Sequence, residues 1–221
     1  MKTLLALILF SVCSLSYAQD IIELEAKQEK DADFFDYEDY TIENGKPVPL
    51  GELVFLKGCS WYCGGSVDTI SASSELKGSG AIDYEPGNAH DFDEKTAWVE
   101  GVEGNGVGEY IEYQFDFNKA PIYNTNLGIN KLIIANGYKK NRLTWENNAR
   151  IKQLLVYVND QPKFLVNLKD SFEIQTVEFE TIKFFNDRTL RLKFEIKDVY
   201  EGTKYKDTAL SLLMFDGVGV H

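Results

Sequence analysis

The sequence predicts an all-β protein, an antiparallel jelly-roll β-sandwich with an acidic N-terminal extension. Short apolar runs rich in Val, Ile, Phe and Tyr recur along the chain, and turn-forming residues separate them. No segment of helical length keeps an apolar stripe at helical spacing, and strands do not alternate with helices. These observations argue against a parallel sheet covered by helices.

Apolar and polar side chains alternate over residues 111–117, as in a strand with one buried face. Further runs of strand length and composition are Lys131–Ala135, Leu154–Asn159, Lys163–Asn167, Phe172–Glu180, Leu190–Ile196 and Ala209–Phe215. The dipeptides between them are typical of turns: Asn136-Gly137, Asn159-Asp160, Lys169-Asp170 and Asn186-Asp187. We therefore expect one sandwich domain over residues 46–221.

The chain before this domain divides into two segments. Residues 1–18 combine Lys2, an apolar run and small residues before position 19, which is the pattern of a secretory signal peptide. Serines interrupt the apolar run, which is too short for a spanning helix, so we expect no transmembrane segment. Residues 19–45 hold ten acidic and two basic residues. They predict a solvated linker or spacer, unless their aromatic residues dock on the domain.

Composition limits the function. The chain of 221 residues carries a formal net charge of −12, whereas nucleic acid and anionic membranes require a basic footprint. It contains 2 His, one of them at the C-terminus, which argues against a His-rich metal site or a histidine-based catalytic triad. With the signal peptide, this composition predicts a secreted protein, extracellular or periplasmic, that does not bind nucleic acid.

Two cysteines remain once the signal peptide is removed, Cys59 and Cys63. In an oxidising compartment we expect them to form a local disulfide. A zinc site would need further soft ligands, and a redox pair usually has two intervening residues instead of three. The bridge would chiefly fix the residues between the cysteines.

The run from His90 to Trp98 contains donors that suit a hard cation. Asp91, Asp93 and Thr96 supply two carboxylates and a hydroxyl in a turn, and Ca²⁺ prefers six to eight such oxygens. The glycine and the final glutamate of an EF-hand are absent at their spacings. The competing interpretation is an acidic turn capped by Thr96.

Ligand sites often combine an aromatic ring with a few polar groups that fix the orientation of the ligand. Three groups in the sequence offer this combination: Trp61 with Tyr62, Tyr138 with Asn136, and Trp145 with Asn148 and Arg150. Each group also has a structural interpretation; Arg150, for example, could pair with a carboxylate on a neighbouring strand. We expect Trp145, in the polar segment 139–148, to be an exposed aromatic residue.

Several spaced motifs resemble a known family. The pattern Asp91-x-Asp93-x-x-Thr96-Ala97-Trp98, preceded by Ala72-Ser73-Ser74, resembles the opening of discoidin-like domains, the coagulation-factor type C group of the galactose-binding-like fold. The glycine-rich run from Trp98 to Glu109 resembles the subgroup called the NAD glycohydrolase translocation domain. Later motifs match the same subgroup: Ile134-x-Asn136-Gly137-Tyr138-x-Lys140 and Asn148-x-Arg150-x-Lys152. The resemblance covers roughly residues 68–217.

This resemblance implies a jelly roll whose loops at one end bind carbohydrate, often with a structural calcium ion. It does not imply NAD hydrolysis, because in the namesake that activity belongs to a separate catalytic domain. The cation ligands it implies are Asp91, Asp93 and Thr96. Related domains complete the site with a glutamate in an Ile-Ser-Glu-Ile run. Here Leu212 replaces that acid, which weakens the case for calcium.

The sequence thus predicts a secreted, non-catalytic module that binds a glycan or cell-surface carbohydrate through loop aromatics and amide or guanidinium groups. The alternative is an extracellular protein-interaction or adhesion domain that has lost sugar binding and exposes an apolar patch. A hydrolase using Glu100, Glu103 or Glu109 is a third possibility, but acids in such a loop are usually only solvated.

Overall fold

The computed structural model describes residues 20–28, 40–43, 46–49, 61–63, 65–80, 82–118, 127–184 and 188–219. For residues 40–43, 46–49 and 63 it describes the backbone alone. The predicted signal peptide and the side chains of Cys59 and Cys63 lie outside the described residues.

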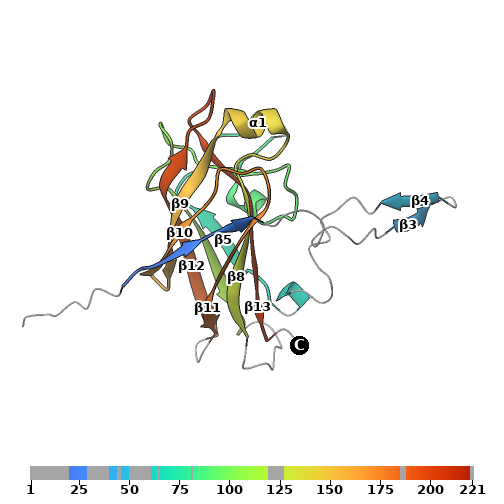
Figure 1. Cartoon of the computed structure of the whole chain (residues 1–221). Helices are drawn as coiled ribbons and strands as arrows, with labels where there is room; N and C mark the ends of the chain where they lie inside the picture. The colour runs from blue at the N-terminus through green and yellow to red at the C-terminus, as the bar shows by residue number, and fades with distance from the viewer. Residues whose placement is uncertain are drawn as a thin grey trace, which may run out of the picture.

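Strands dominate the described part of the chain (Figure 1). The strands are β1 (Ile22–Glu25), β2 (Lys27–Gln28), β3 (Tyr40–Glu43), β4 (Lys46–Pro49), β5 (Thr69–Ala72), β6 (Trp98–Val99), β7 (Tyr110–Asp116), β8 (Gly128–Asn136), β9 (Ala149–Val158), β10 (Gln161–Asn167), β11 (Gln175–Lys183), β12 (Thr189–Tyr200) and β13 (Thr208–Val218). The helical segments are the 3₁₀ turns η1 (Trp61–Cys63) and η2 (Pro86–Ala89) and the short helix α1 (Arg142–Asn147).

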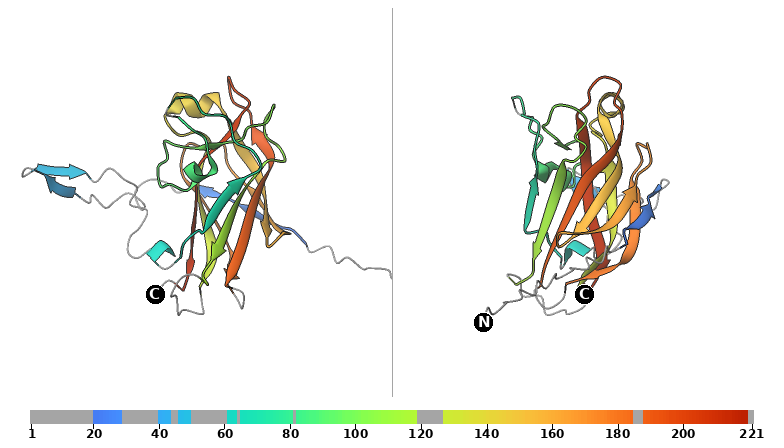
Figure 2. Two further views of the ribbon diagram at one scale, coloured as in Figure 1. Left: turned by 180° about the vertical axis from the view of Figure 1, so that it is seen from behind. Right: turned by 90° about the vertical axis from the view of Figure 1, so that its left-hand side faces the viewer.

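Eleven strands form one continuous sheet in the order β2-β11-β8-β13-β9-β12-β7-β5, with β10 beside β9, β1 beside β10 and β6 beside β13. Only two residue pairs join β13 to β9, Thr208 with Ala149 and Ala209 with Arg150. The sheet turns back on itself at this junction, so β9 and β12 face β8 and β13 as two layers (Figure 2). Most strand pairs are antiparallel, and the predicted all-β sandwich is confirmed.

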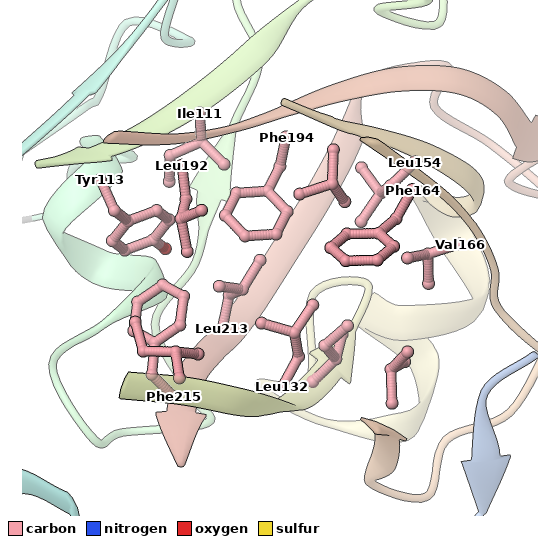
Figure 3. Close-up of a cluster of buried hydrophobic side chains, with 14 of the residues drawn as sticks. Ile111, Tyr113, Leu132, Leu154, Phe164, Val166, Leu192, Phe194, Leu213 and Phe215 are labelled. Carbon is pink, nitrogen blue, oxygen red and sulfur yellow. The ribbon is translucent and has the colours of Figure 1, made fainter. Parts of the chain in front are cut away.

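The core lies between the two layers. Leu154, Phe164 and Phe194 of one layer lie across from Leu132 and Leu213 of the other (Figure 3). The strand predicted at residues 111–117 is β7, in which every second side chain is buried.

The prediction of a solvated spacer is wrong for residues 22–28, which form two strands of the sheet. Strand β1 pairs in parallel with β10, and β2 pairs antiparallel with β11, so the segment contacts both layers (blue in Figures 1 and 2). Ala26, between the two strands, is 2% exposed. Asn167 Nδ2 donates hydrogen bonds of 2.7 Å to both Glu23 and Glu25, which accommodates the acidic side chains at the edge. Further along, the β3–β4 hairpin spans the predicted boundary at residues 45 and 46.

The strand register brings several loops to the same end of the sandwich. The pairing of β8 with β13, β9 with β12 and β9 with β10 places residues 137–148, 168–174 and 201–207 together, next to residues 100–109. We call these four segments the loop end. Helix α1, yellow at the top of Figure 1, lies there, whereas η1 lies toward the opposite end. In the part of the chain that the structure describes, no helix is long and apolar enough to cross a membrane.

Candidate functional site

Trp145 lies in α1, but its side chain is only 5% exposed. The helix begins after Asn141, whose side chain accepts a hydrogen bond from the Thr144 backbone N–H as an N-cap. This turn directs Trp145 against the end of β8, where its Nε1 donates to the Asn136 carbonyl at 2.8 Å. The expectation of an exposed Trp145 is therefore wrong, because a polar segment forms a helical turn with one buried side.

Arg150 is also buried, with 6% of its surface exposed. It makes a bidentate pair with Asp170, with N–O distances of 2.7 and 3.1 Å, and its guanidinium stacks 4.5 Å from the centre of the Trp145 ring. Its Nη1 also donates to the carbonyls of Trp145 and Asn148. Arg150 thus uses its donors within the protein, in agreement with the structural interpretation of this residue.

The amide groups predicted to bind a ligand also form hydrogen bonds within the protein, and Tyr138 packs within it. Asn136 is 1% exposed and exchanges two hydrogen bonds with the Ile151 backbone, which fixes β8 against β9. The amide nitrogen of Asn148 donates to the Thr144 carbonyl at 2.8 Å. Tyr138 is 9% exposed and packs edge-on against Tyr84. These groups support the loop end from beneath.

Trp61 and Tyr62 lie away from that cluster. Trp61 is a core residue, 1% exposed, and its Nε1 donates to the Gly128 carbonyl near the opposite end. Tyr62 accepts a hydrogen bond from the Phe215 backbone N–H at 2.8 Å, and burial raises its pKa far above the ordinary value. The seven predicted ligand-binding residues therefore separate into three in the loop end, two in the strands directly beneath it and two elsewhere.

Two large exposed side chains of the loop end come from α1 and the loop after β12, in addition to Val102 and Val107 of the glycine-rich loop. Leu143 is 66% exposed, and Tyr205, at 43%, is the exposed aromatic residue among the described residues of this end. Backbone N–H groups of Thr203 and Tyr205 donate to the carbonyls of Glu146 and Asn147 at 2.9 and 2.8 Å. These bonds fix the loop to α1. Tyr205 is not among the residues predicted from the sequence, because a single tyrosine in a polar loop carries no distinctive pattern.

The predicted cation ligands meet in one turn but bond to each other. Thr96 Oγ1 donates to Asp91 Oδ2 at 2.7 Å, and the backbone N–H groups of Asp93 and Lys95 donate to the side chains of Asp91 and Asp93. Leu212 is fully buried in an apolar cluster. Among the described residues, no three acidic, His or Cys side chains gather to hold a metal. Thr96 Oγ1 also lies 2.8 Å from the Asp93 carbonyl and 3.4 Å from the Asn88 carbonyl. The residues thus form the hydrogen-bonded acidic turn of the alternative interpretation, and calcium binding at this turn stays a prediction.

The acids of the glycine-rich loop also serve the fold. Glu100 is fully buried, and its two carboxylate oxygens accept hydrogen bonds from the backbone N–H groups of Val102 and Thr208, at 2.9 and 3.1 Å. Burial raises its pKa. Glu109 accepts hydrogen bonds of 2.6 and 2.5 Å from Ser73 and Ser74. Both carboxylates are therefore engaged in holding neighbouring segments together.

The sandwich with its glycine-rich loop and buried Glu100 corresponds to one sequence family. The family model named NAD glycohydrolase translocation F5/8 type C domain matches residues 61–216. The chain belongs to this family. In this NAD glycohydrolase translocation-type domain, β1 and β2 lie outside the matched range. The resemblance found in the motifs is thereby confirmed.

Solved structures show the same fold. The translocation-type domain is similar to the CBM32-1 and CBM32-2 domains of Clostridium perfringens ZmpB, with a TM-score of 0.56 and 12% identity over 92% of this chain. The same pair in complex with GalNAc gives a TM-score of 0.54 at 12% identity, again over 92% of this chain.

This chain covers less than half of those structures, 43% and 42% of their length, so they carry more than one such unit. The CBM32 domains of these two structures are carbohydrate-binding modules, a non-catalytic kind of domain. At this level of identity the similarity establishes the fold alone. No protein with a curated description is a significant match.

Proposed function

We propose that this protein is a secreted, non-catalytic glycan-binding domain, and that it binds sugar at the loop end with Tyr205 as the stacking ring. The fold supports this proposal, because a structure with the same arrangement of strands was obtained in complex with GalNAc. The observation that carries it is the exposed Tyr205 ring on a loop that backbone hydrogen bonds fix to α1. A ring held in place before binding loses little conformational entropy when a sugar stacks on it.

The surroundings of Tyr205 supply groups that suit hydroxyls. Asn147 lies beside it and already accepts a hydrogen bond from the Thr203 hydroxyl at 3.1 Å, and Lys204 lies 4.8 Å from the centre of the Tyr205 ring. Glu201, two residues before Thr203, is exposed and accepts a hydrogen bond from Asn105 of the glycine-rich loop. Polar side chains of α1 and of the loop after β12 thus lie beside the exposed ring, and the glycine-rich loop contacts the same loop at Glu201.

A glycan array followed by calorimetry tests this proposal. We expect Tyr205→Ala to weaken binding of the best array ligand by about 10-fold, and Tyr205→Phe to keep most of the affinity, since stacking needs the ring and not the hydroxyl. Phe92→Ala is the matched control, because Phe92 is also an exposed aromatic residue, 37% exposed, but packs against Tyr62 outside the loop end.

A blank array would overturn the proposal in favour of a protein-interaction domain. Unchanged affinity in Tyr205→Ala, or a loss confined to Phe92→Ala, would show that the sugar does not bind at the loop end.

A further inference from the structure

Three cations surround two aromatic rings beneath the loop end. Trp145 and Phe172 meet edge-to-face, with 5.7 Å between their ring centres. Lys139 lies 5.1 Å from the Phe172 ring, Arg150 lies 4.5 Å from the Trp145 ring, and Arg142 lies 4.9 and 5.3 Å from Trp145 and Phe172. Cations at these distances are attracted to the faces of the rings.

Two of these cations are buried and already neutralised. Lys139 is 8% exposed and forms an ion pair with Glu94. Arg150 is 6% exposed and pairs with both oxygens of Asp170. A buried cation needs such a partner, so these two pairs are explained by the stability of the fold.

Arg142 differs from them in exposure and in contacts. Its side chain is 63% exposed, and it forms an ion pair with Glu146, one helical turn away, through a single bond of 2.9 Å from Nε. Within the part of the chain that the structure describes, no hydrogen bond engages the two terminal nitrogens of its guanidinium. The rings of Trp145 and Phe172 and the bond to Glu146 limit the rotation of this planar group. The two terminal nitrogens are therefore donors available at the surface, beside the two rings.

We propose that Arg142 binds the anionic group of an acidic sugar, a carboxylate or a sulfate, so that the domain selects anionic glycans. This inference rests on the proposed glycan-binding function. A planar guanidinium with two parallel N–H donors matches the two oxygens of such a group. Arg142 is also linked to the Tyr205 loop, because Glu146 holds its Nε through the side chain and accepts the Thr203 N–H through the backbone.

The overall charge of −12 does not prevent this recognition. Repulsion between an acidic ligand and distant acids is screened beyond about 8 Å at physiological ionic strength, whereas a direct contact with a guanidinium is not. The negative surface instead disfavours unspecific binding of polyanions. An acidic sugar gains affinity only where its charge meets Arg142 while its ring is held by the loop.

Sugars that differ only in charge test the proposal. We would measure binding of galactose, galacturonate and galactose-6-sulfate oligosaccharides to the wild-type protein and to Arg142→Gln and Arg142→Lys. We expect Arg142→Gln to weaken binding of the acidic sugars by about 10-fold or more and to leave galactose binding unchanged. Arg142→Lys should give an intermediate loss, since a point charge replaces the fork. Preference for galacturonate or for the sulfate distinguishes the two anions.

A matched control removes one positive charge elsewhere. Lys163 lies on β10 next to the turn at residues 159–160, away from the loop end, and Lys163→Gln should affect neither class of sugar. If the wild-type protein binds galactose at least as well as its acidic analogues, the preference for anions is wrong while glycan binding stands. If Arg142→Gln weakens neutral and acidic sugars equally, Arg142 is a structural residue and the inference fails. If no sugar binds, the proposed function itself fails.

Discussion

Gly137 determines how the buried part of the loop end packs. Its φ is +83°, in the region that favours glycine, and a Cβ there would lie 2.7 Å from both Arg150 Cγ and Trp145 Cδ1. The Asn136-Gly137 pair, which the sequence marked as a turn, therefore does more than reverse the chain. It leaves the space in which Arg150 stacks on Trp145.

We expect Gly137→Ala to lower the free energy of unfolding by about 2–4 kcal/mol, because a backbone penalty and overpacking add. Gly80→Ala is the matched control: φ is +67° and no atom lies within 4 Å of the added Cβ, so about 1–2 kcal/mol of backbone penalty remains. Urea denaturation monitored by tryptophan fluorescence measures both. Equal losses in the two variants would contradict the packing role of Gly137.

His90 is a second residue whose environment has a measurable consequence. It lies among aromatic rings, including Tyr62 and Tyr113, and its Nδ1 is 2.8 Å from the Leu213 carbonyl. Burial lowers its pKa from the ordinary value of 6.5, against the weaker opposing effects of that carbonyl and of Asp91. The neutral imidazole is therefore the form that suits the folded protein.

We expect stability to fall as the pH drops below about 6.5, because the unfolded chain then binds a proton that folded His90 does not. The contribution is complete above that pH and decreases until the lowered pKa of the folded state is reached. Unfolding free energies of the wild type and His90→Gln, measured from about pH 7.5 to 5, should converge as the pH falls. A constant difference across this range would show that His90 does not titrate differently on folding.

At the scale of elements, the turn between η2 and β6 can be interpreted either as a calcium site or as a hydrogen-bonded acidic turn. The Asp91, Asp93 and Thr96 side chains satisfy each other and nearby backbone groups, and calcium would have to displace the Thr96 hydroxyl from Asp91. We therefore expect the thermal midpoint to be the same in excess Ca²⁺ and in EDTA. A rise with calcium that is lost in Asp91→Asn would contradict the hydrogen-bonded turn and restore the cation site.

The strands were predictable because their alternation is a local property. The strand at residues 111–117 was predicted correctly, because one face of β7 contacts the core and the other does not, which gives an alternating sequence pattern. The strands at residues 22–28 were not predictable, because the acidic composition of this segment favours disorder. Their pairing depends on strand edges more than 100 residues away in the sequence, beside Asn167 and Gln175.

The candidate site was harder to predict than the fold. The motifs identified residues that gather at the loop end, but composition cannot tell a stacking ring from a buried one. Trp145 is buried because Gly137 and Arg150 form its pocket. Tyr205 is exposed because its loop is attached to α1 through backbone bonds and the Thr203 hydroxyl, and not through the tyrosine ring. Exposure of an aromatic residue is set by tertiary contacts that the local sequence does not encode.

At the scale of the whole molecule, the N-terminal segment joins the two layers on the side away from the β9–β13 junction. Its strands cover the outer edges of β10 and β11, which would otherwise present unpaired backbone groups. The family match begins at residue 61, so this closure is an addition to the matched domain. Ala26 lies where the chain crosses from one layer to the other, and its N–H donates to the Asn167 carbonyl at 2.9 Å.

We expect Ala26→Asp to destabilise the protein by about 1–3 kcal/mol, because a buried charge forces the segment off the edges. The loss cannot exceed the docking free energy of the segment, so deletion of residues 20–28 should cost at least as much. Ile21→Asp, at a residue 47% exposed, should change stability by no more than about 0.5 kcal/mol. Urea denaturation gives these values, and hydrogen exchange should show faster exchange in β10 and β11 for Ala26→Asp. Unchanged exchange in those strands would mean that the segment does not close the sandwich in solution.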